Sequence, residues 1–351
     1  MKKIFYFVCF LLFFSFSAKA ETDVVSEVFE TLAQDYIVEK TPKEIALKGL
    51  KAITDIDKDI LIKHTTDKIF LYQKDKVLAK FDMPQNEYDK NSWIEFCKDV
   101  LQKSTKLSSK LDVLDFELPD RFANAVFKDL DGYSNYFSVF STEGDEPIRI
   151  RRQFASRVID DILLIRVLSF QRGVSQKIKT AVEECSICKG IILDLRGNHG
   201  GFFDEAVKIA DLFLDEGIVA YTTSPLTDES QYFTAETGDI AFSKPMVVLI
   251  DGMTASAAEI LAASLSEQNR AVLVGTKTYG KGTVQDVKKI GGERAMSVTT
   301  SFFYTPSGLK IDKIGVTPMI CVTTGENCDK EDRLNKEEDI ERAVMLIKTG
   351  I

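Results

Sequence analysis

Two side chains of this sequence, Ser256 and Lys281, together have the functional groups for nucleophilic catalysis. Ser256 follows the segment 251–255 (DGMTA) and precedes a mostly apolar stretch, so this order predicts a serine at the beginning of a helix. There the Ala257 N–H and the positive end of the helix can face a developing oxyanion. A purely structural interpretation stays open, because Ser256 and Glu259 also have the spacing of a capping box.

Lys281 is the candidate general base for Ser256, since neither histidine of the chain is placed for that role. The sequence holds only two histidines, and one of them, His199, lies in a glycine-rich segment typical of a loop. This scarcity disfavours a Ser-His-Asp hydrolase and a histidine-ligated metal centre, and we expect no metal and no other cofactor. Lys281 itself lies between two glycines, a pattern that also fits an ordinary solvated turn.

A lysine acts as a base only when its amine is neutral, so Lys281 needs a poorly hydrated pocket that lowers its pKa. Gln285 can accept a hydrogen bond from that amine and orient its lone pair. Residues four positions apart in a straight strand are about 13 Å apart, so the two side chains meet only if Gly280 and Gly282 bend the chain. The apolar residues available to line such a pocket are Ala255, Ala257 and Val284.

Residues 194–201 (DLRGNHGG) form a third segment of interest. They end an apolar run that predicts a buried strand, and their glycines allow a backbone N–H to approach a ligand closely. An ordinary strand-to-helix turn is the alternative interpretation. A phosphate loop is excluded, because the Gly-Lys-Ser/Thr ending is missing.

The elements that would position these segments alternate strands with helices after about Pro147, which predicts an α/β fold. Buried strands rich in Ile, Leu and Val are predicted at 162–168, 190–195, 245–250 and 271–275. Helices are predicted at 174–184, 204–214, 256–267 and 338–348, and a further strand pair at 283–290 and 294–304. The chain before this point, from about residue 23 to 133, is predicted to be mainly helical, with helices at 91–103 and 119–130 and a hairpin at 69–81.

Taken together, the motifs resemble those of the C-terminal processing peptidases, also called tail-specific proteases. They occur in the order of that family, as residues 194–201, then 255–260 (ASAAEI), 270–285 (RAVLVGTKTYGKGTVQ) and 304–308 (YTPSG). The 25 residues from Ser256 to Lys281 also agree with the family. The resemblance extends from about residue 149 to 322, and more loosely over 130–136 (LDGYSNY) and the last helix.

The resemblance implies roles for individual residues in peptide hydrolysis. These are Ser256 as nucleophile, Lys281 as general base, Gln285 as its orienting partner, and the N–H groups of Ala257 and of Gly200 or Gly201 as the oxyanion hole. Glu267 stands where some members carry an acidic residue. The implied protein is a secreted serine endopeptidase that acts through an acyl-enzyme, with a crotonase-like α/β core joined to an N-terminal mainly helical region.

One departure from the family concerns substrate recognition. Members normally carry a PDZ domain between the helical region and the core, where it captures the C-terminal carboxylate of the substrate. Only nine residues separate Phe137 from Pro147 here, so we expect that domain to be absent. This departure keeps an alternative open, a catalytically idle protease-like protein that binds or regulates partners in the cell envelope. A thioester-binding enzyme of the same fold is disfavoured by the serine and lysine pair.

The expected organisation has four parts: a signal peptide over 1–20, the N-terminal region over 21–137, a peptidase core without a PDZ insertion over 138–325, and a C-terminal helical segment over 326–351. Two lysines, the apolar run 4–16 and a small-residue cleavage site predict the signal peptide. The run is shorter than the roughly 18 to 20 residues of a membrane span, so none is expected after cleavage, although retention as an anchor stays open. The protein is therefore expected to be periplasmic or otherwise extracytoplasmic.

Charge and cysteine content narrow the range of partners. The 351 residues include 45 Lys and Arg against 54 Asp and Glu, a net charge of −9, which disfavours nucleic acid and anionic membranes. The expected partners are a polypeptide substrate and, as an open alternative, an envelope adaptor protein. In an oxidising compartment Cys185 can pair with Cys188, and Cys321 with Cys328, as structural disulfides, with inert thiols as the alternative. Cys97 is expected to be free and buried.

Overall fold

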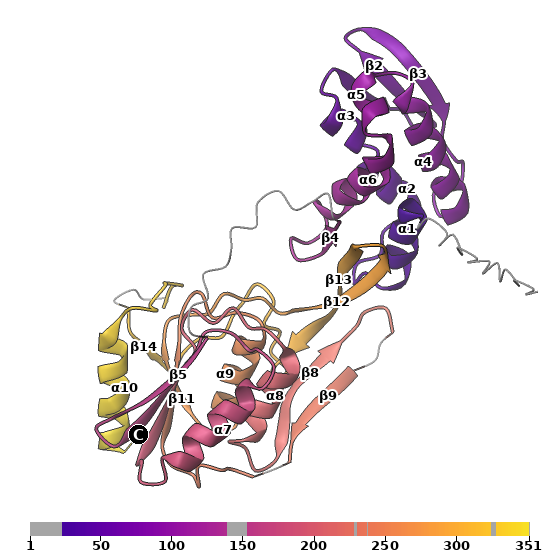
Figure 1. Ribbon diagram of the computed structural model, residues 1–351. Helices are drawn as coiled ribbons and strands as arrows, with labels where there is room; N and C mark the ends of the chain where they lie inside the picture. The colour runs from indigo at the N-terminus through magenta and orange to yellow at the C-terminus, as the bar shows by residue number, and fades with distance from the viewer. Residues whose placement is uncertain (1–22, 139–152, 228–229, 237, 324–327, 351) are drawn as a thin grey trace, which may run out of the picture.

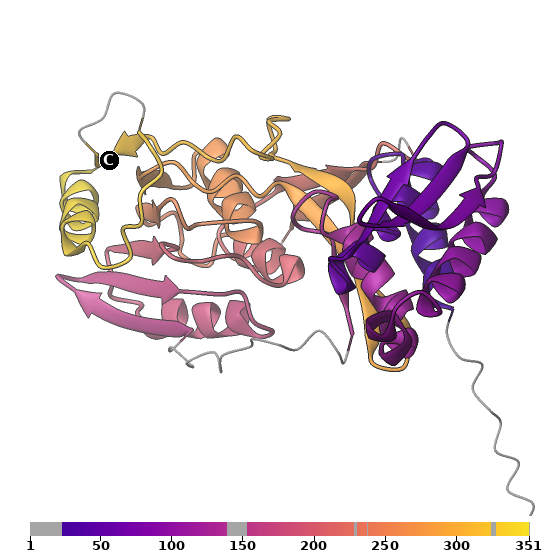
Figure 2. The ribbon, with the colours of Figure 1, turned by 90° about the horizontal axis from the view of Figure 1, so that it is seen from above.

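The computed structural model describes residues 23–138, 153–227, 230–236, 238–323 and 328–350. They form an N-terminal region and a larger α/β core, which lie side by side and are joined by a long hairpin of the core (Figures 1 and 2). The predicted α/β class is therefore confirmed. The predicted signal peptide lies outside the described residues.

A six-stranded sheet forms the centre of the core, with the strand order β14-β11-β10-β7-β6-β5. Its strands pair in parallel, except that β5 is antiparallel to β6 at one edge. The central strands are runs of Ile, Leu and Val buried on both faces, as expected for a covered parallel sheet. The strands are β5 (Phe154–Ile159), β6 (Ile162–Val167), β7 (Gly190–Asp194), β10 (Met246–Ile250), β11 (Val272–Gly275) and β14 (Ile320–Cys321).

Helices cover both faces of this sheet. On one face α7, α8 and α9 enclose the main hydrophobic cluster, whereas α10 packs on the opposite face against alternate residues of the same strands (Figure 1). This arrangement places the beginning of α9 directly after the carboxyl end of β10. The helices are α7 (Val174–Glu184), α8 (Phe203–Asp211), α9 (Ala257–Glu267) and α10 (Glu337–Thr349).

A second sheet, ordered β12-β13-β8-β9, joins the core to the N-terminal region, and the short strand β4 pairs with β13. The far end of the β12–β13 hairpin reaches the N-terminal region (Figure 2), where Ile290, Met296 and Val298 belong to its hydrophobic cluster. The boundary predicted at residue 137 therefore divides the sequence, but not the hydrophobic packing. These strands are β4 (Asn135–Phe137), β8 (Gly217–Thr223), β9 (Ser230–Ala235), β12 (Thr283–Gly291) and β13 (Arg294–Tyr304).

The N-terminal region packs helices around a three-stranded antiparallel sheet, β1-β2-β3. The hairpin predicted at 69–81 is present as β2 and β3, but the strand β1 before it was missed. The helices are α1 (Val24–Gln34), α2 (Pro42–Gly49), α3 (Ala52–Ile56), α4 (Lys90–Thr105), α5 (Ser109–Val113) and α6 (Leu118–Phe127), with a 3-10 turn η1 (Asp115–Glu117). The strands are β1 (Ile60–His64), β2 (Lys68–Gln73) and β3 (Lys76–Asp82).

Both predicted cysteine pairs form disulfides, Cys185–Cys188 and Cys321–Cys328, and Cys97 is free and buried as expected. Cys185 lies directly after the end of α7 rather than at the beginning of a helix, which agrees with a structural role. In the described part of the chain, no helix has the length and apolar character needed to cross a membrane.

Candidate active site

Ser256 lies on a sharp turn between β10 and α9. Its backbone has φ +58° and ψ −126°, a conformation that costs energy for any residue other than glycine. An ordinary helix N-cap has extended backbone angles instead. Ser256 is partly exposed, whereas the residues on either side of it, Ala255 and Ala257, are buried. The capping-box spacing is therefore real, but the serine backbone is held in a strained turn that a simple cap does not need.

Buried hydrogen bonds fix the turn before Ser256. The Asp251 carboxylate accepts a bond from the Gly197 N–H at 3.0 Å, and the Thr254 hydroxyl donates to the Leu195 carbonyl at 2.9 Å. Both bonds connect the turn to the segment 194–201, which follows the neighbouring strand β7. Because β7 and β10 are parallel and adjacent, the two motif segments meet at the same edge of the sheet.

The buried carboxylate of Glu259 connects the segment that ends at Ser256 (249–256, the serine segment) with the segment that contains Lys281 (276–282, the lysine segment). It accepts hydrogen bonds from the backbone N–H groups of Ser256 at 2.8 Å, Gly280 at 2.7 Å and Lys281 at 2.8 Å, and from the Thr278 hydroxyl at 2.5 Å. Burial raises the pKa of Glu259, and these four bonds oppose that rise because they favour the anion. One carboxylate thus sets the spacing between the two candidate catalytic segments.

From the sequence, Glu259 is predicted only as a possible capping residue. The sequence signal that could have identified its wider role is a glutamate in a predicted helix whose other residues are mainly apolar. Buried carboxylates need several hydrogen-bond donors, so such a residue predicts that another segment packs against the helix.

The ammonium group of Lys281 lies 5.1 Å from the centroid of the Tyr133 ring. Burial lowers the pKa of Lys281, and the negative charge of Asp131 opposes this shift. Among the described residues, no hydrogen bond or ion pair to the Lys281 ammonium is found. Gly282 is required for close packing here, because a Cβ atom at that position would lie 2.1 Å from the Asp312 nitrogen.

Asp131 and Tyr133 belong to a loop of the N-terminal region that docks on β13. The Asp131 carboxylate accepts bonds from the N–H groups of Tyr133 and Ser134, and the Ser134 hydroxyl accepts a bond from the Thr299 N–H at 3.0 Å. In the sequence this loop shows only a loose resemblance to the family, and the residues predicted around Lys281 are apolar residues of the core. The aromatic ring beside Lys281 belongs to Tyr133, which is about 150 residues away in sequence. No local sequence pattern reveals such a contact.

Gln285 lies on β12, directly after an irregularity in the pairing with β13. Its side-chain N–H groups donate to the hydroxyls of Thr283 at 2.8 Å and Thr299 at 3.2 Å. In the described part of the chain, no hydrogen bond joins Gln285 to Lys281. The nitrogen is thus held by two threonines, and the carbonyl oxygen of the same amide remains the group with which Gln285 can accept a bond.

Two of the three candidate oxyanion-hole residues, Gly200 and Ala257, lie beside Ser256. A Cβ atom on Gly200 would lie 3.0 Å from the Ser256 Cβ and 3.1 Å from the Ala257 nitrogen, so the absence of a side chain permits this contact. The Gly200 N–H donates to the Asn198 side chain at 2.8 Å, whereas the N–H groups of Gly201 and Ala257 have no acceptor among the described residues. Of the two predicted glycines, Gly201 therefore has the N–H that is free for a ligand.

Glu267 is not brought to this site. It is the last residue of the eleven-residue helix α9, roughly 16 Å along the axis from Ser256, and its carboxylate accepts a bond from the Ser307 N–H at 2.8 Å.

No group of three or more His, Cys, Asp or Glu side chains arranged to hold a metal ion occurs within the residues that the structure describes.

The central part of this chain is similar in sequence to known proteins. Residues 161–322 match the family model described as Peptidase family S41. The carboxy-terminal-processing protease of Bartonella bacilliformis is 38% identical over 172 residues, a match that covers 47% of this chain and 40% of that protein. The chloroplastic carboxyl-terminal-processing peptidase 2 of Arabidopsis thaliana is 37% identical over 156 residues, covering 44% of this chain and 30% of that protein. The match thus spans well under two thirds of the length of these relatives.

A lipoprotein structure from Streptococcus agalactiae resembles a larger part of the chain, with a TM-score of 0.52 over 90% of this chain and 99% of that one. Its sequence identity is 14%, so this likeness concerns the fold alone. The matched residues 161–322 contain the segments that bear Gly201, Ser256 and Lys281, in the order found in the family. Over residues 161–322 the chain therefore matches peptidase family S41, and over this part it is similar to carboxy-terminal-processing proteases.

Proposed function

We propose that this protein is a serine endopeptidase that hydrolyses polypeptides with a Ser256–Lys281 dyad. The observation that carries the proposal is the shared Glu259 carboxylate, which accepts bonds from the backbone N–H groups of both residues. The strained backbone of Ser256 and the lowered pKa of Lys281 support it further, because activated nucleophiles and neutral lysine bases need such environments.

The proposed reaction has two stages. The neutral amine of Lys281 takes the proton of Ser256 Oγ as this oxygen attacks the peptide carbonyl carbon. The N–H groups of Ala257 and Gly201 stabilise the oxyanion that forms, and Lys281 then gives its proton to the departing amine. Water hydrolyses the acyl-enzyme by the same transfers, with Lys281 again as base. This returns Ser256 Oγ–H and releases the new carboxyl end.

Gln285 is proposed to orient Lys281 during these proton transfers. Its nitrogen donates to two threonine hydroxyls, so its carbonyl oxygen is the group that would accept a bond from the Lys281 amine. This bond requires a change in the position of the Lys281 side chain, which lies over the Tyr133 ring in the structure.

We also propose a crotonase-like topology for the core and an extracytoplasmic location. The two disulfides support that location, because such bonds persist in oxidising compartments. β4 ends at Phe137 and β5 begins at Phe154, and this short interval supports recognition of the polypeptide without a PDZ domain at that position. An envelope adaptor protein remains a proposed partner for substrate delivery.

The test compares the protein with its Ser256→Ala and Lys281→Ala variants on an unstructured polypeptide. Each substitution is expected to lower kcat/KM by at least about 10³-fold, because both side chains act in the transition state. Lys289→Ala, which changes an exposed lysine of β12, is the matched control and should retain activity. A serine-directed fluorophosphonate should label the protein at Ser256. Unchanged hydrolysis in either variant would refute the dyad, and failure of both hydrolysis and labelling in the unmodified protein would favour the idle binding protein.

A further inference from the structure

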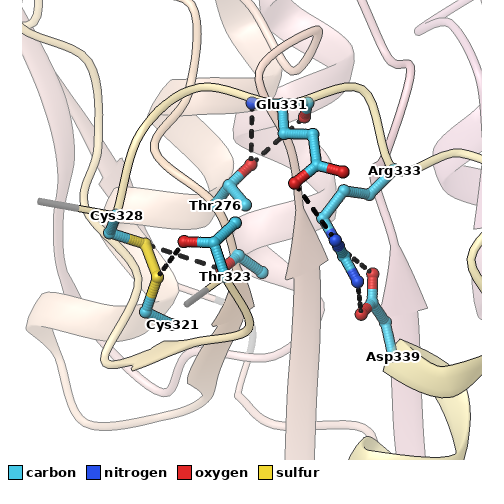
Figure 3. The surroundings of a disulfide bond; sticks show 8 residues. Thr276, Cys321, Thr323, Cys328, Glu331, Arg333 and Asp339 are labelled. Atoms are coloured by element: carbon cyan, nitrogen blue, oxygen red, sulfur yellow. Dashed lines mark hydrogen bonds and ion pairs between the residues drawn. A yellow bond between two sulfur atoms is a disulfide. The ribbon is translucent and has the colours of Figure 1, made fainter. Parts of the chain in front are cut away.

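The segment 328–333, here called the C-terminal strap, lies outside the two candidate catalytic segments and touches both. It begins at Cys328, which the disulfide to Cys321 joins to the end of β14 (Figure 3). It ends at Arg333, whose guanidinium is buried and donates two bonds to the Asp339 carboxylate of α10, at 2.9 and 2.8 Å. The strap is therefore fixed at both ends by features other than the catalytic segments.

The strap first contacts the turn that leads to Ser256. The Gly252 N–H donates to the Glu331 carbonyl at 2.7 Å, and the Arg333 N–H donates to the Asp251 carboxylate at 3.1 Å. Asp251 is the same carboxylate that holds the segment 194–201 through the Gly197 N–H. The position of this turn thus depends on the strap as well as on the sheet.

The strap also contacts the segment that leads to Lys281. The Thr276 hydroxyl bonds both to the Glu331 carbonyl, at 3.2 Å, and to the Glu331 N–H, at 3.4 Å (Figure 3). The Lys277 N–H donates to the Cys328 carbonyl at 3.3 Å, and the Lys330 ammonium donates to the Tyr279 carbonyl at 2.5 Å. Three residues that precede Lys281 are therefore bonded to three residues of the strap.

We propose that the C-terminal strap is a positioning device that sets the spacing of Ser256 and Lys281 from the outside, as Glu259 does from the inside, and that the Cys321–Cys328 disulfide keeps it in place. This inference rests on the proposed function. Glu331 connects the two segments through its main chain, because its carbonyl accepts a bond from each of them, from Gly252 and from Thr276. Alignment of this kind matters, since a misplacement of about 1 Å can cost a factor of about 10² in rate.

The first test removes one disulfide at a time. The Cys321→Ser/Cys328→Ser protein is expected to lose about tenfold or more in kcat and in the rate of fluorophosphonate labelling, with KM changed much less, because alignment and not binding is affected. Cys185→Ser/Cys188→Ser is the matched control, because that disulfide lies after α7, away from the catalytic segments. It should keep its labelling rate. Equal labelling rates in the unmodified protein and the strap variant would overturn the proposal.

A second pair of variants tests the contact without touching a cysteine. Thr276→Val removes the hydroxyl that bonds Glu331 and should lower kcat and the labelling rate several-fold, whereas Thr276→Ser keeps the hydroxyl and should restore both. Loss of rate in both variants would indicate a general packing defect and contradict the proposed contact.

Hydrogen exchange separates failure of the strap from failure of the proposed function. In the strap variant, amide exchange should accelerate at 249–256 and at 276–282 together, and in the disulfide control it should accelerate only around α7 and β7. If the unmodified protein has no activity but this pattern appears, the strap holds the segments and the proposed function is wrong. If the protein is active and exchange in both segments is unchanged, the strap proposal is wrong and the function stands.

Discussion

The serine segment and the lysine segment are held in different ways. The serine turn lies inside one strand-turn-helix unit, and its bonds come from the adjacent strand, from α9 and from the strap. The lysine backbone is fixed by Glu259, but its ammonium faces Tyr133 and Asp131 of the N-terminal region. The placement of the nucleophile is thus a property of the core, whereas the protonation of the base depends on a second region of the molecule.

Buried polar contacts attach that second region to the core. The Arg294 guanidinium of β13 donates two bonds to the Asp120 carboxylate of α6, at 2.9 and 3.0 Å, and the Tyr136 hydroxyl donates to the same carboxylate at 2.5 Å. Asp120 is buried, so loss of one partner leaves unpaired groups inside the interface. The loop that carries Tyr133 lies between α6 and β4, so these contacts also fix its position.

The largest effect is expected where the serine and lysine segments meet, at Glu259. Glu259→Ala should lower kcat/KM by more than about 10²-fold and the free energy of unfolding by about 3 kcal/mol or more, because it leaves four donors without their acceptor. The measurements are peptide hydrolysis and urea unfolding. Glu205→Ala removes another buried carboxylate, which binds Ser175, and should destabilise the protein without a comparable loss of kcat. Equal losses of activity in the two variants would contradict a specific role for Glu259.

A smaller effect is expected from loosening the N-terminal region. Asp120→Asn should lower the free energy of unfolding by about 2 to 3 kcal/mol, since it weakens a buried, charge-assisted pair with Arg294. It should also reduce activity, because the loop bearing Tyr133 loses its anchor. Glu117→Gln, which breaks the more exposed pair with Arg121, should change the free energy by no more than about 0.5 kcal/mol. Full activity in a destabilised Asp120→Asn protein would show that the anchoring of the N-terminal region does not affect the active site.

The dependence of the base on the N-terminal region is tested by the pH profile of Asp131→Asn. Asp131 favours the charged form of Lys281 and so raises its pKa, and its neutralisation should lower that pKa further. The acidic limb of kcat/KM, where Lys281 loses its proton, should therefore move to lower pH. Asparagine keeps an oxygen that can accept the bonds from Tyr133 and Ser134. Asp129→Asn, near the same loop, is the control, and a limb that moves to higher pH would contradict the assignment.

The smallest effect concerns stability at the lysine itself. Because burial places the pKa of Lys281 below its ordinary value of 10.5, the folded protein holds the ammonium less well than the unfolded chain does. The resulting decrease in the free energy of unfolding is fully present below the folded-state pKa of Lys281. It vanishes as the pH rises through the unfolded-state pKa. Lys281→Met should therefore unfold at a slightly higher temperature than the unmodified protein at neutral pH, and the difference should narrow toward pH 10. A lower melting temperature in this variant would show that the surroundings of the Lys281 ammonium stabilise its charged form, contrary to this prediction.

Regular patterns predicted most of the core elements. The helix predicted at 174–184 has those bounds in α7, and the four predicted runs of Ile, Leu and Val are β6, β7, β10 and β11. The strands β5, β8 and β9 were missed. β5 is exposed or half-exposed along its whole length at the sheet edge, and β8 and β9 have mixed burial, so none of them carries a continuous apolar run.

Local sequence patterns are sufficient to locate the candidate catalytic residues. They place Ser256 at the beginning of a helix and Lys281 between glycines, because capping signals, apolar runs and glycines act over a few residues. How the two residues are brought together depends on the packing of distant segments. Glu259, Tyr133 and the C-terminal strap act across long sequence distances, through buried hydrogen bonds and the exclusion of water. Such contacts depend on which surfaces pack against each other, and no local pattern of residues specifies that.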